Sequence, residues 1–505
     1  MGGLLHFCMI TTFYPPYNFG GDGILVQRLS NELARRGHRV DVIHCMDSYR
    51  FGAPMPSEGY RDHPNVTVHG LKSSLGVLSP LATHQSGFPL LKSRRIRAIL
   101  KEGFDVIHYH NISLLGGAKI LEYGHAIKLY TLHDYWLVCP THALFKFNRA
   151  PCPRPTYCFF CTLVYKRPPQ WWRYSGLMQK AVKNVDAFIA PSFTSQCKHQ
   201  QLGLNAHIVH FPNFVSLVDV GSSTPNTFDS QPPEEPYFLF VGRLEKLKGL
   251  HTLIPLFQRY QKAQLWIAGT GSEGSSFREL TRGSTNIRFL GHQSGRRLQA
   301  LYRRAAAVIY PSLNFQTGLP QTSRGQGAPL VIMEAFSQKT PVIVSNLGGI
   351  PALIEQTGGG FVYSTEQELL AAMDQLVADP LRRRELGLRG YHAYRQNWTA
   401  EAHLKRYFAL IEEVATTRSR SVAQRAFQNR SKGTHRGGIH KRNMALRTVA
   451  RRSPKKKARN CLLKEIQKRF LRASSPIMSG RGRIFPRMLV QKPISMRAKR
   501  AKNGE

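Results

Sequence analysis

Acidic residues and long apolar runs are what this sequence has least of. Its 505 residues contain 30 Asp and Glu against 71 Lys and Arg, a formal net charge of +41. No apolar stretch approaches the roughly 20 residues of a membrane-spanning helix, so we expect none. The N-terminus has no basic segment before its apolar run, so we expect no signal peptide. The eight cysteines are scattered apart from one cluster, which fits the reducing cytoplasm.

The positive charge is concentrated at the C-terminus. Residues 417–505 contain 27 Lys and Arg against 2 Asp and Glu, and their few apolar residues have no sustained periodicity. We therefore predict a disordered basic tail, which can bind nucleic acid or an anionic membrane or can reflect translation past the natural end. The surplus in residues 1–416 fits a peripheral enzyme at a membrane face, although solvated surface charge explains it almost as well.

The run VGRLEKLKG at residues 241–249 is the most informative segment. It follows an apolar run that predicts a buried strand, and it precedes apolar residues at helical spacing: Leu250, Leu253, Ile254 and Phe257. The N–H groups and dipole of a helix start favour an anion, and Arg243 and Lys248 can clamp a diphosphate. A strand, loop and helix with two solvated bases is the alternative reading of this segment alone.

Two similar halves follow one another along the chain. The apolar run 4–11, the glycine-rich loop 18–23, a helix ending at Gly37 and the strand 39–45 form the opening of a doubly wound sheet. Further strands are predicted at 105–110, 127–132 and 186–190, and then at 237–241, 264–268, 287–290, 307–310 and 341–345. Apolar strands alternating with helices predict parallel sheets covered on both faces. We predict an α/β protein with two tandem Rossmann-like domains, 1–217 and 237–416, joined by a linker, 218–236.

The order of these segments resembles glycosyltransferase family 4, whose members have the GT-B fold. The similarity runs from about residue 4 to about residue 414 and includes TLHDYW, VGRLEKLKG, IAGTG and LVIMEAFSQKTPVIVSNLGGIPALIE. The most specific part is Glu334 with Ala335 and the segment TPVIV that follows. The resemblance implies a cleft between the two domains, a nucleotide-sugar donor held mainly by the second domain and an acceptor held mainly by the first. It also implies transfer with retention and without a metal ion.

The resemblance assigns the donor site residue by residue. Arg243 and Lys248 would neutralise the diphosphate, which is also the leaving group, and Glu334 would bind the ribose hydroxyls. A glutamate near a helix start is more often a partner of the helix dipole when nothing else is known. The remaining donor-binding residues would be Gly20, Gly21, His292, Gln326, Gly327, Ala328, Leu330 and Val331.

The first domain would supply the groups next to the reacting sugar. His133 follows the predicted strand 127–132, at the sheet edge where ligands bind in open α/β sheets. The resemblance places His133 near that sugar and Asp22 at the acceptor. A histidine in this position is otherwise more often structural. No residue stands out as a covalent nucleophile, which agrees with attack by the acceptor on the face of the leaving group.

One position departs from the family pattern. The family usually has a second glutamate eight positions before Glu334, and here Gln326 stands there, inside the polar loop 314–328. The amide can bind sugar hydroxyls but carries no charge. Either the donor site is adapted or the loop reflects decay, so activity follows less directly from the sequence than the fold does.

Two further motifs suggest other chemistry. The segment Gly269 to Gly274 matches the dinucleotide fingerprint G-x-G-x-x-G, but the acidic residue expected about twenty positions later is missing, which argues against an NAD-dependent oxidoreductase. The cysteine cluster with its C-x-x-C pair can hold a structural zinc, yet its spacing is irregular and free thiols are the simpler expectation. We expect no metal or cofactor. The cluster consists of Cys139, Cys152, Cys158 and Cys161.

The sequence thus predicts a cytoplasmic retaining glycosyltransferase, a hexosyltransferase, with a glycan or lipid-linked acceptor. Peripheral contact with the anionic inner face of the cell membrane fits such an acceptor. The alternatives are a degenerate sugar-nucleotide binder or epimerase on the same fold and, through the basic tail, a nucleic-acid-binding protein. The sugar, nucleotide base and acceptor are not encoded in any motif.

Overall fold

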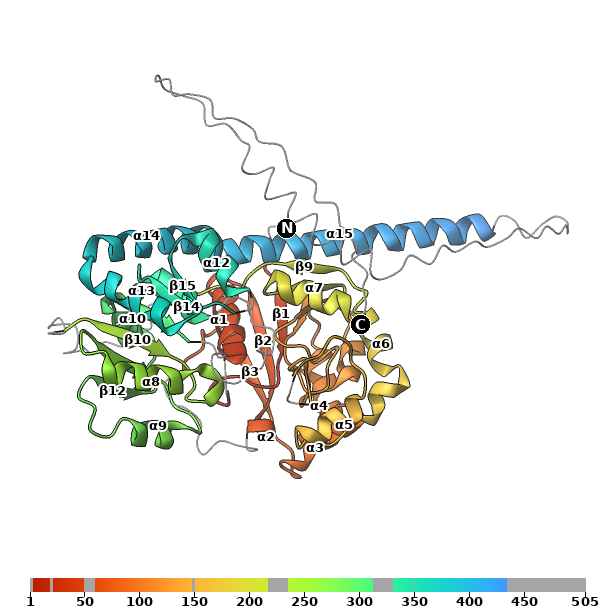
Figure 1. Cartoon of the computed structure of the whole chain (residues 1–505). Coiled ribbons are helices and arrows are strands. Elements are labelled where there is room, and N and C mark those ends of the chain that lie inside the picture. Colours follow the sequence, from red (N-terminus) through yellow and green to blue (C-terminus); the bar gives the residue numbers. More distant parts are fainter. Residues whose placement is uncertain are drawn as a thin grey trace, which may run out of the picture. The chain divides into compact units, whose positions relative to one another are not determined.

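The computed structural model describes residues 3–18, 21–49, 60–147, 150–216, 235–311, 330–347 and 349–433. Within them, two parallel β-sheets of seven and six strands are each flanked by helices (Figure 1). The fold is the two-domain α/β architecture GT-B, as predicted. Among the helices described, none is both long and apolar enough to cross a lipid bilayer.

The first sheet has the strand order β3-β2-β1-β4-β5-β8-β9. The central strand β1 lies between β2 and β4, where Phe7 is paired with Val40 and Val106. All pairs are parallel, and β1, β4 and β5 are almost wholly buried because helices cover both faces. The strands are β1 His6–Ile10, β2 Arg39–Cys45, β3 Val66–Leu71, β4 Val106–Tyr109, β5 Ile127–Thr131, β8 Ala187–Ala190 and β9 Ile208–His210.

The second sheet repeats this plan with the order β12-β11-β10-β13-β14-β15. Again the first strand in sequence, β10, is central, and Leu239 is paired with Trp266 and Val308. The strands are β10 Tyr237–Val241, β11 Gln264–Ala268, β12 Ile287–Gly291, β13 Ala307–Tyr310, β14 Val342–Ser345 and β15 Gly360–Tyr363. A short antiparallel hairpin is formed separately by β6 Phe145–Lys146 and β7 Ala150–Pro151.

Helices fill the connections between strands. Those of the first half are α1 Gly21–Arg35, α2 Met46–Tyr49, α3 Leu78–Ser86, α4 Ser93–Leu100, α5 Cys158–Val164, α6 Leu177–Ala181 and α7 Phe193–Gln201, with 3₁₀ turns η1 Leu90–Lys92, η2 Ala118–Glu122, η3 Trp171–Ser175 and η4 Val182–Asn184. Those of the second half are η6 Lys246–Lys248, α8 Leu250–Arg259, α9 Gly274–Leu280, α10 Gly295–Arg304, α11 Leu330–Ser337, α12 Ile350–Thr357, α13 Glu366–Ala378, α14 Pro380–Asn397 and α15 Ala400–Gly433.

The two helices that follow the glycine-containing loops have the predicted buried faces. In α8 the four apolar residues at helical spacing are all fully buried. In α1, Val26, Leu29 and Leu33 are buried, and Gly37 has the positive φ of +90° expected just after a helix end. The sequence therefore placed both helices correctly.

The last described helix, α15, packs on the first sheet rather than the second. Its residues Leu404, Tyr407, Leu410 and Ile411 are buried in one apolar cluster with residues of β1, β2 and α1. The helix runs across the predicted boundary at residue 416 and ends at Gly433. The predicted domain boundaries stay predictions, and residues 218–234 of the predicted linker 218–236 lie outside the described residues.

All ten strands predicted from apolar runs are present. Besides the short hairpin strands β6 and β7, the sequence did not reveal β3, β9 and β15, each of which forms a sheet edge and is partly exposed. A half-exposed edge strand mixes polar and apolar residues, so it carries no continuous apolar run.

Candidate active site

The carboxyl ends of β1 and β5 bring Asp22 and His133 together. Asp22 lies in the first turn of α1, and His133 lies two residues after β5. Burial lowers the pKa of His133, while the nearby carboxylates of Asp22 and Asp134 oppose this shift. His133 is therefore a neutral imidazole at pH 7, next to the residue predicted at the acceptor.

A buried chain of side chains supports His133 from behind. His110 Nδ1 lies 3.0 Å from His133 Nε2, and the two rings are stacked with centroids 5.2 Å apart. The ring of His108 lies 4.1 Å from that of His110. Burial lowers the pKa of both His108 and His110, so these rings are neutral as well. The sequence did not single out His110, because a histidine inside an apolar strand reads as core.

This row of buried side chains ends at a tyrosine of α15. Tyr407 is completely buried, and its hydroxyl lies 3.0 Å from His108 Nδ1. His108 Nε2 lies 2.8 Å from the hydroxyl of Thr131 at the end of β5. If Tyr407 donates its proton to Nδ1, Nε2 carries the hydrogen of the neutral ring and donates it to Thr131. Hydroxyl groups thus contact both ring nitrogens of His108.

Glu334 is held by one residue from each half of the chain. Its Oε1 accepts a hydrogen bond of 2.9 Å from the Arg28 guanidinium on α1, and its Oε2 accepts one of 2.9 Å from the Tyr302 hydroxyl on α10. Tyr302 is buried, whereas the side chains of Arg28 and Glu334 keep 21% and 16% of their surface exposed. Glu334 is therefore an oriented carboxylate that still has access to solvent. No sequence motif indicated Arg28 or Tyr302 as its partners.

The start of α1 also approaches the start of α11. A Cβ built on Gly21 would lie 3.1 Å from Leu330 Cδ1, so Gly21 and Leu330 are almost in contact. Val331, the next residue of α11, is partly buried. Two of the predicted donor-binding positions, one from each half, are thus neighbours.

The predicted diphosphate loop is built on close backbone contacts. Gly249 has φ +77°, and a Cβ there would lie 1.8 Å from the Pro311 carbonyl oxygen. Gly269 meets the Gly242 carbonyl in the same way. The loops after β10, β11 and β13 are thus packed against each other at the sheet edge where ligands bind, and only glycine fits at such positions.

The two predicted cations lie on this loop. Arg243 is about half exposed, and its guanidinium lies 2.8 Å from the Glu245 carboxylate. Lys248 ends the turn η6, with one residue between it and the start of α8, and its Nζ lies 6.0 Å from the ring centroid of Tyr310. Arg243 is therefore paired with Glu245. A diphosphate that binds there must displace Glu245 or share Arg243 with it.

Of the other predicted positions the structure describes only His292. His292 directly follows β12 and is exposed. Gly20, Gln326, Gly327 and Ala328 lie outside the described residues, and their predicted roles stay predictions.

The four clustered cysteines line one small cavity beside the hairpin of β6 and β7. Their nearest polar partners are protein groups; for example, Cys139 Sγ lies 3.3 Å from the Thr141 hydroxyl, and Cys152 donates to the Arg154 carbonyl at 2.9 Å. Within the described ranges, no three His, Cys, Asp or Glu side chains are arranged to hold a metal ion. The cluster remains a set of free thiols in this structure.

The structure has two tandem parallel sheets, with glycine-containing loops and a histidine after the carboxyl ends of their strands. These features define a GT-B transferase. The chain belongs to the family 4, group 1 glycosyltransferases. Residues 19–218 match the model "Glycosyltransferase Family 4", and residues 224–393 match "Glycosyl transferases group 1". The chain is 32% identical over 399 residues to the glycogen synthase of Mycobacterium tuberculosis, covering 74% of this chain and 86% of that protein.

Solved structures show the same fold. The sucrose-phosphate synthase of Thermosynechococcus elongatus superimposes with a TM-score of 0.61 at 19% identity, covering 82% of this chain and 100% of that one. The Anabaena protein HepE in complex with UDP and glucose gives a TM-score of 0.51 at 16% identity, covering 83% and 100%. At these identities the similarity concerns the fold.

Proposed function

We propose that this chain transfers a hexose from a nucleotide-sugar donor to a glycan or lipid-linked acceptor, with retention of the anomeric configuration. The observation that carries the proposal is the Arg28–Glu334–Tyr302 contact, which orients the carboxylate that the resemblance to the family assigns to the ribose. The complex of HepE with UDP and glucose is consistent with such a donor.

The donor is held by the second half of the chain. Arg243 and Lys248 neutralise the diphosphate, aided by the N–H groups at the start of α8. Glu334 accepts hydrogen bonds from the ribose hydroxyls, and His292 lies at the nucleobase. Gln326, Gly327, Ala328, Leu330 and Val331 line the phosphate and sugar, with Gly20 and Gly21 opposite.

The reaction takes place beside His133. The bond between the sugar carbon and the diphosphate oxygen breaks, the acceptor oxygen forms the new bond on the same face, and the acceptor proton goes to the departing diphosphate. Arg243 and Lys248 stabilise the charge that develops on that leaving group. Neutral His133 hydrogen-bonds a hydroxyl of the reacting sugar, and Asp22 positions the acceptor. No metal ion takes part.

We place this reaction in the cytoplasm, with a lipid-linked acceptor presented at the inner face of the cell membrane. The seven cysteines among the described residues are all free thiols, which supports a reducing compartment.

A donor screen tests the proposal. UDP-, GDP- and ADP-sugars are added to the full chain, and thermal unfolding is recorded; a ligand at 100 times its Kd stabilises by about 2.7 kcal/mol. The donor that binds is then incubated with candidate acceptors, and release of the nucleoside diphosphate is measured. Stabilisation with turnover supports a transferase, stabilisation without turnover by any acceptor supports the degenerate binder, and no stabilisation by any nucleotide sugar contradicts both.

A further inference from the structure

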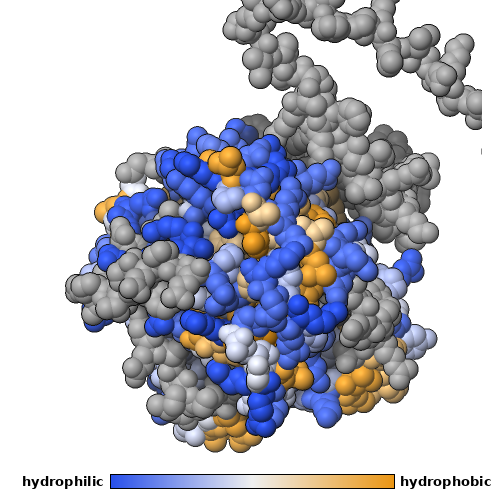
Figure 2. Space-filling model, turned by 60° about the vertical axis from the view of Figure 1, so that its left-hand side comes forward, coloured by the Kyte–Doolittle hydropathy of each residue, from blue (hydrophilic) through white to orange (hydrophobic). Residues whose placement is uncertain are grey.

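Exposed apolar side chains are gathered in two segments of the first half. Of the 18 large apolar side chains that are exposed in the described part of the chain, 13 belong to residues 75–91 and 157–174. They include Trp171, Tyr174, Tyr157 and Phe160, with exposed fractions of 59–69%. The face turned to the viewer in Figure 2, by contrast, is mainly hydrophilic with small separate apolar groups. Apolar surface gathered in this way marks an interaction site.

The two segments are in contact with each other. The Trp172 indole donates a hydrogen bond of 2.9 Å to the His84 carbonyl, which joins η3 to α3. The Trp171 ring lies 4.9 Å from that of Phe159 on α5. Helix α3 is accordingly in contact with η3. We call the exposed large apolar residues of 75–91 and 157–174 the apolar face.

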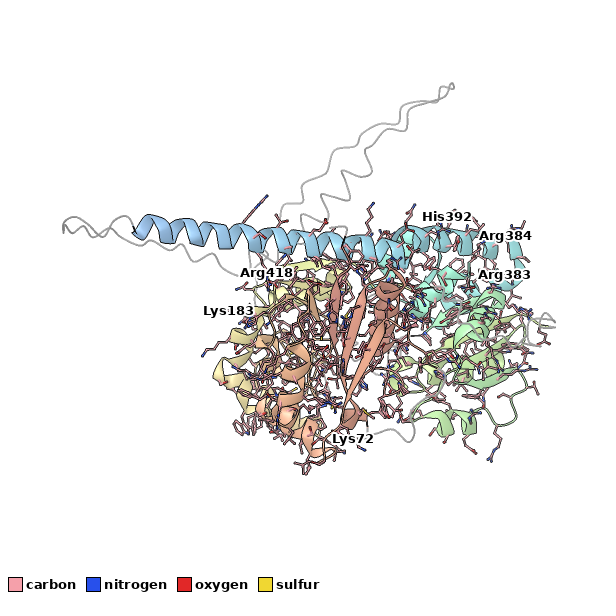
Figure 3. All side chains as sticks on the ribbon, turned by 180° about the vertical axis from the view of Figure 1, so that it is seen from behind. Lys72, Lys183, Arg383, Arg384, His392 and Arg418 are labelled. Carbon is pink, nitrogen blue, oxygen red and sulfur yellow. The ribbon has the colours of Figure 1, made fainter. Side chains whose placement is uncertain are left out.

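The sequence around the apolar face contains no acidic residue. Residues 63–101 contain six Lys and Arg and no Asp or Glu, and residues 135–185 contain eight Lys and Arg and again no Asp or Glu. Arg94, Arg95, Lys180 and Lys183 are exposed, and Lys183 points away from the ribbon in Figure 3. Apolar and aromatic side chains beside cations, with no anion near them in the sequence, complement an anionic lipid surface.

We propose that the apolar face docks on an anionic lipid bilayer. Tryptophan and tyrosine favour the headgroup level of a membrane, and leucine and valine gain by entering the acyl region. Single-stranded nucleic acid also binds basic and aromatic surfaces, but through stacking on rings. Eight of the 13 exposed side chains are leucine or valine, which offer no ring, and this composition favours the bilayer.

The apolar face connects to the candidate active site. Arg173 lies under the face, with its guanidinium 4.9 Å from the ring centroid of Trp172, and donates a hydrogen bond of 2.7 Å to the Trp136 carbonyl. Trp136 N–H in turn donates to Asp134, the neighbour of His133. The residues that underlie the apolar face therefore also contact the segment next to His133. The docking itself does not depend on the proposed function.

Trp171 provides a selective probe of this docking. The other four tryptophans of the chain are 1–7% exposed, whereas Trp171 is 65% exposed. The full chain is mixed with phosphatidylcholine vesicles that contain phosphatidylglycerol and brominated acyl chains. We expect quenching of tryptophan emission, most of it lost in Trp171→Phe, and little quenching when phosphatidylglycerol is omitted. The basic segment 417–505 contains no tryptophan, so binding through that segment alone leaves the emission unchanged.

Matched double variants test the apolar contribution. Phe160→Ser with Leu163→Ser should weaken vesicle binding by about tenfold, since two apolar side chains lose their burial in lipid. Leu280→Ser with Leu381→Ser removes exposed apolar residues of the second half and should change nothing. Vesicle binding without quenching refutes the proposal, as does an equal effect of the two double variants. Displacement of the vesicles by a short oligonucleotide, with quenching of Trp171 by that oligonucleotide, assigns the face to nucleic acid instead.

Discussion

Replacing Tyr302 by phenylalanine removes one of the two hydrogen bonds that orient Glu334 and leaves the carboxylate itself in place. The hydroxyl lies 2.9 Å from Glu334 Oε2, and Tyr302 is 1% exposed, so no water can easily take its place. A hydrogen bond to a charged group contributes about 1.5–3 kcal/mol. Because Glu334 keeps some exposure to solvent, we expect the lower end of this range, about 1.5 kcal/mol, as the loss in the free energy of unfolding.

The same change should weaken the binding of the donor. A carboxylate that is free to rotate must be ordered again when the ribose binds, so the Kd of the nucleotide should rise roughly three- to tenfold, the upper limit corresponding to about 1.4 kcal/mol. Glu334→Gln should raise it at least about tenfold, because the charge-assisted bonds to the ribose are lost and Arg28 has no anion. Isothermal titration with the nucleotide that stabilises the chain measures both values.

Tyr237→Phe is the matched control. Tyr237 is also 1% exposed, and its hydroxyl donates 2.7 Å to the Leu301 carbonyl, one residue from Tyr302. This variant should lose stability and keep the nucleotide Kd of the parent. If Glu334→Gln and Tyr302→Phe fold and bind nucleotide as the parent does, Glu334 does not hold the ribose, and the central observation of the proposed function fails.

Four other outcomes follow from the structure. Arg243→Ala and Lys248→Ala should each slow transfer by at least about tenfold, because each removes a charged phosphate contact; unchanged turnover in both excludes them from the donor site. Burial lowers the pKa of His403 to about 4 from 6.5, so its contribution to stability is present above pH 6.5 and is lost as the pH falls towards 4. Between pH 7 and pH 5 the free energy of unfolding of His403→Gln should fall by about 2 kcal/mol less than that of the parent, and denaturant titrations at the two pH values measure this. Transfer assayed with EDTA should equal transfer without it, and a loss restored by Zn²⁺ would contradict a metal-free site. Gln326→Glu should raise turnover if the loop 314–328 has decayed, since a carboxylate binds sugar hydroxyls about twice as strongly as an amide, whereas a fall in turnover would mean that the loop is adapted.

The sequence predicted the central strands of both sheets because each of them is buried on both faces. Strands such as Tyr237–Val241 and Ala307–Tyr310 consist almost entirely of apolar residues, and such runs need no knowledge of their neighbours. The edge strand Val66–Leu71 was missed, since its partial exposure allows polar residues among the valines. The hairpin of β6 and β7 has only two residues in each strand, too few for any periodicity.

The candidate site was predicted only where a short motif carries it. Glu334, Arg243 and His133 lie in segments that resemble the family's. In the structure Arg243 and His133 each lie two residues after a strand, and Glu334 lies in the middle of α11. Arg28 and Tyr302 were not found, because their relation to Glu334 arises only when residues 306 and 32 positions apart meet in space. A single sequence has no local signal for such a contact.

The position of α15 has a consequence for biosynthesis. This helix is made after both sheets, yet Leu404, Tyr407 and Leu410 belong to the apolar cluster of the first sheet. The half of the molecule that leaves the ribosome first therefore lacks part of its core until roughly 190 further residues, up to Leu404 and beyond, have been translated. During that time the surface that α15 will cover is open to chaperones and to other nascent chains. A nonsense mutation in the second half before Leu404 would leave that surface uncovered in the truncated product.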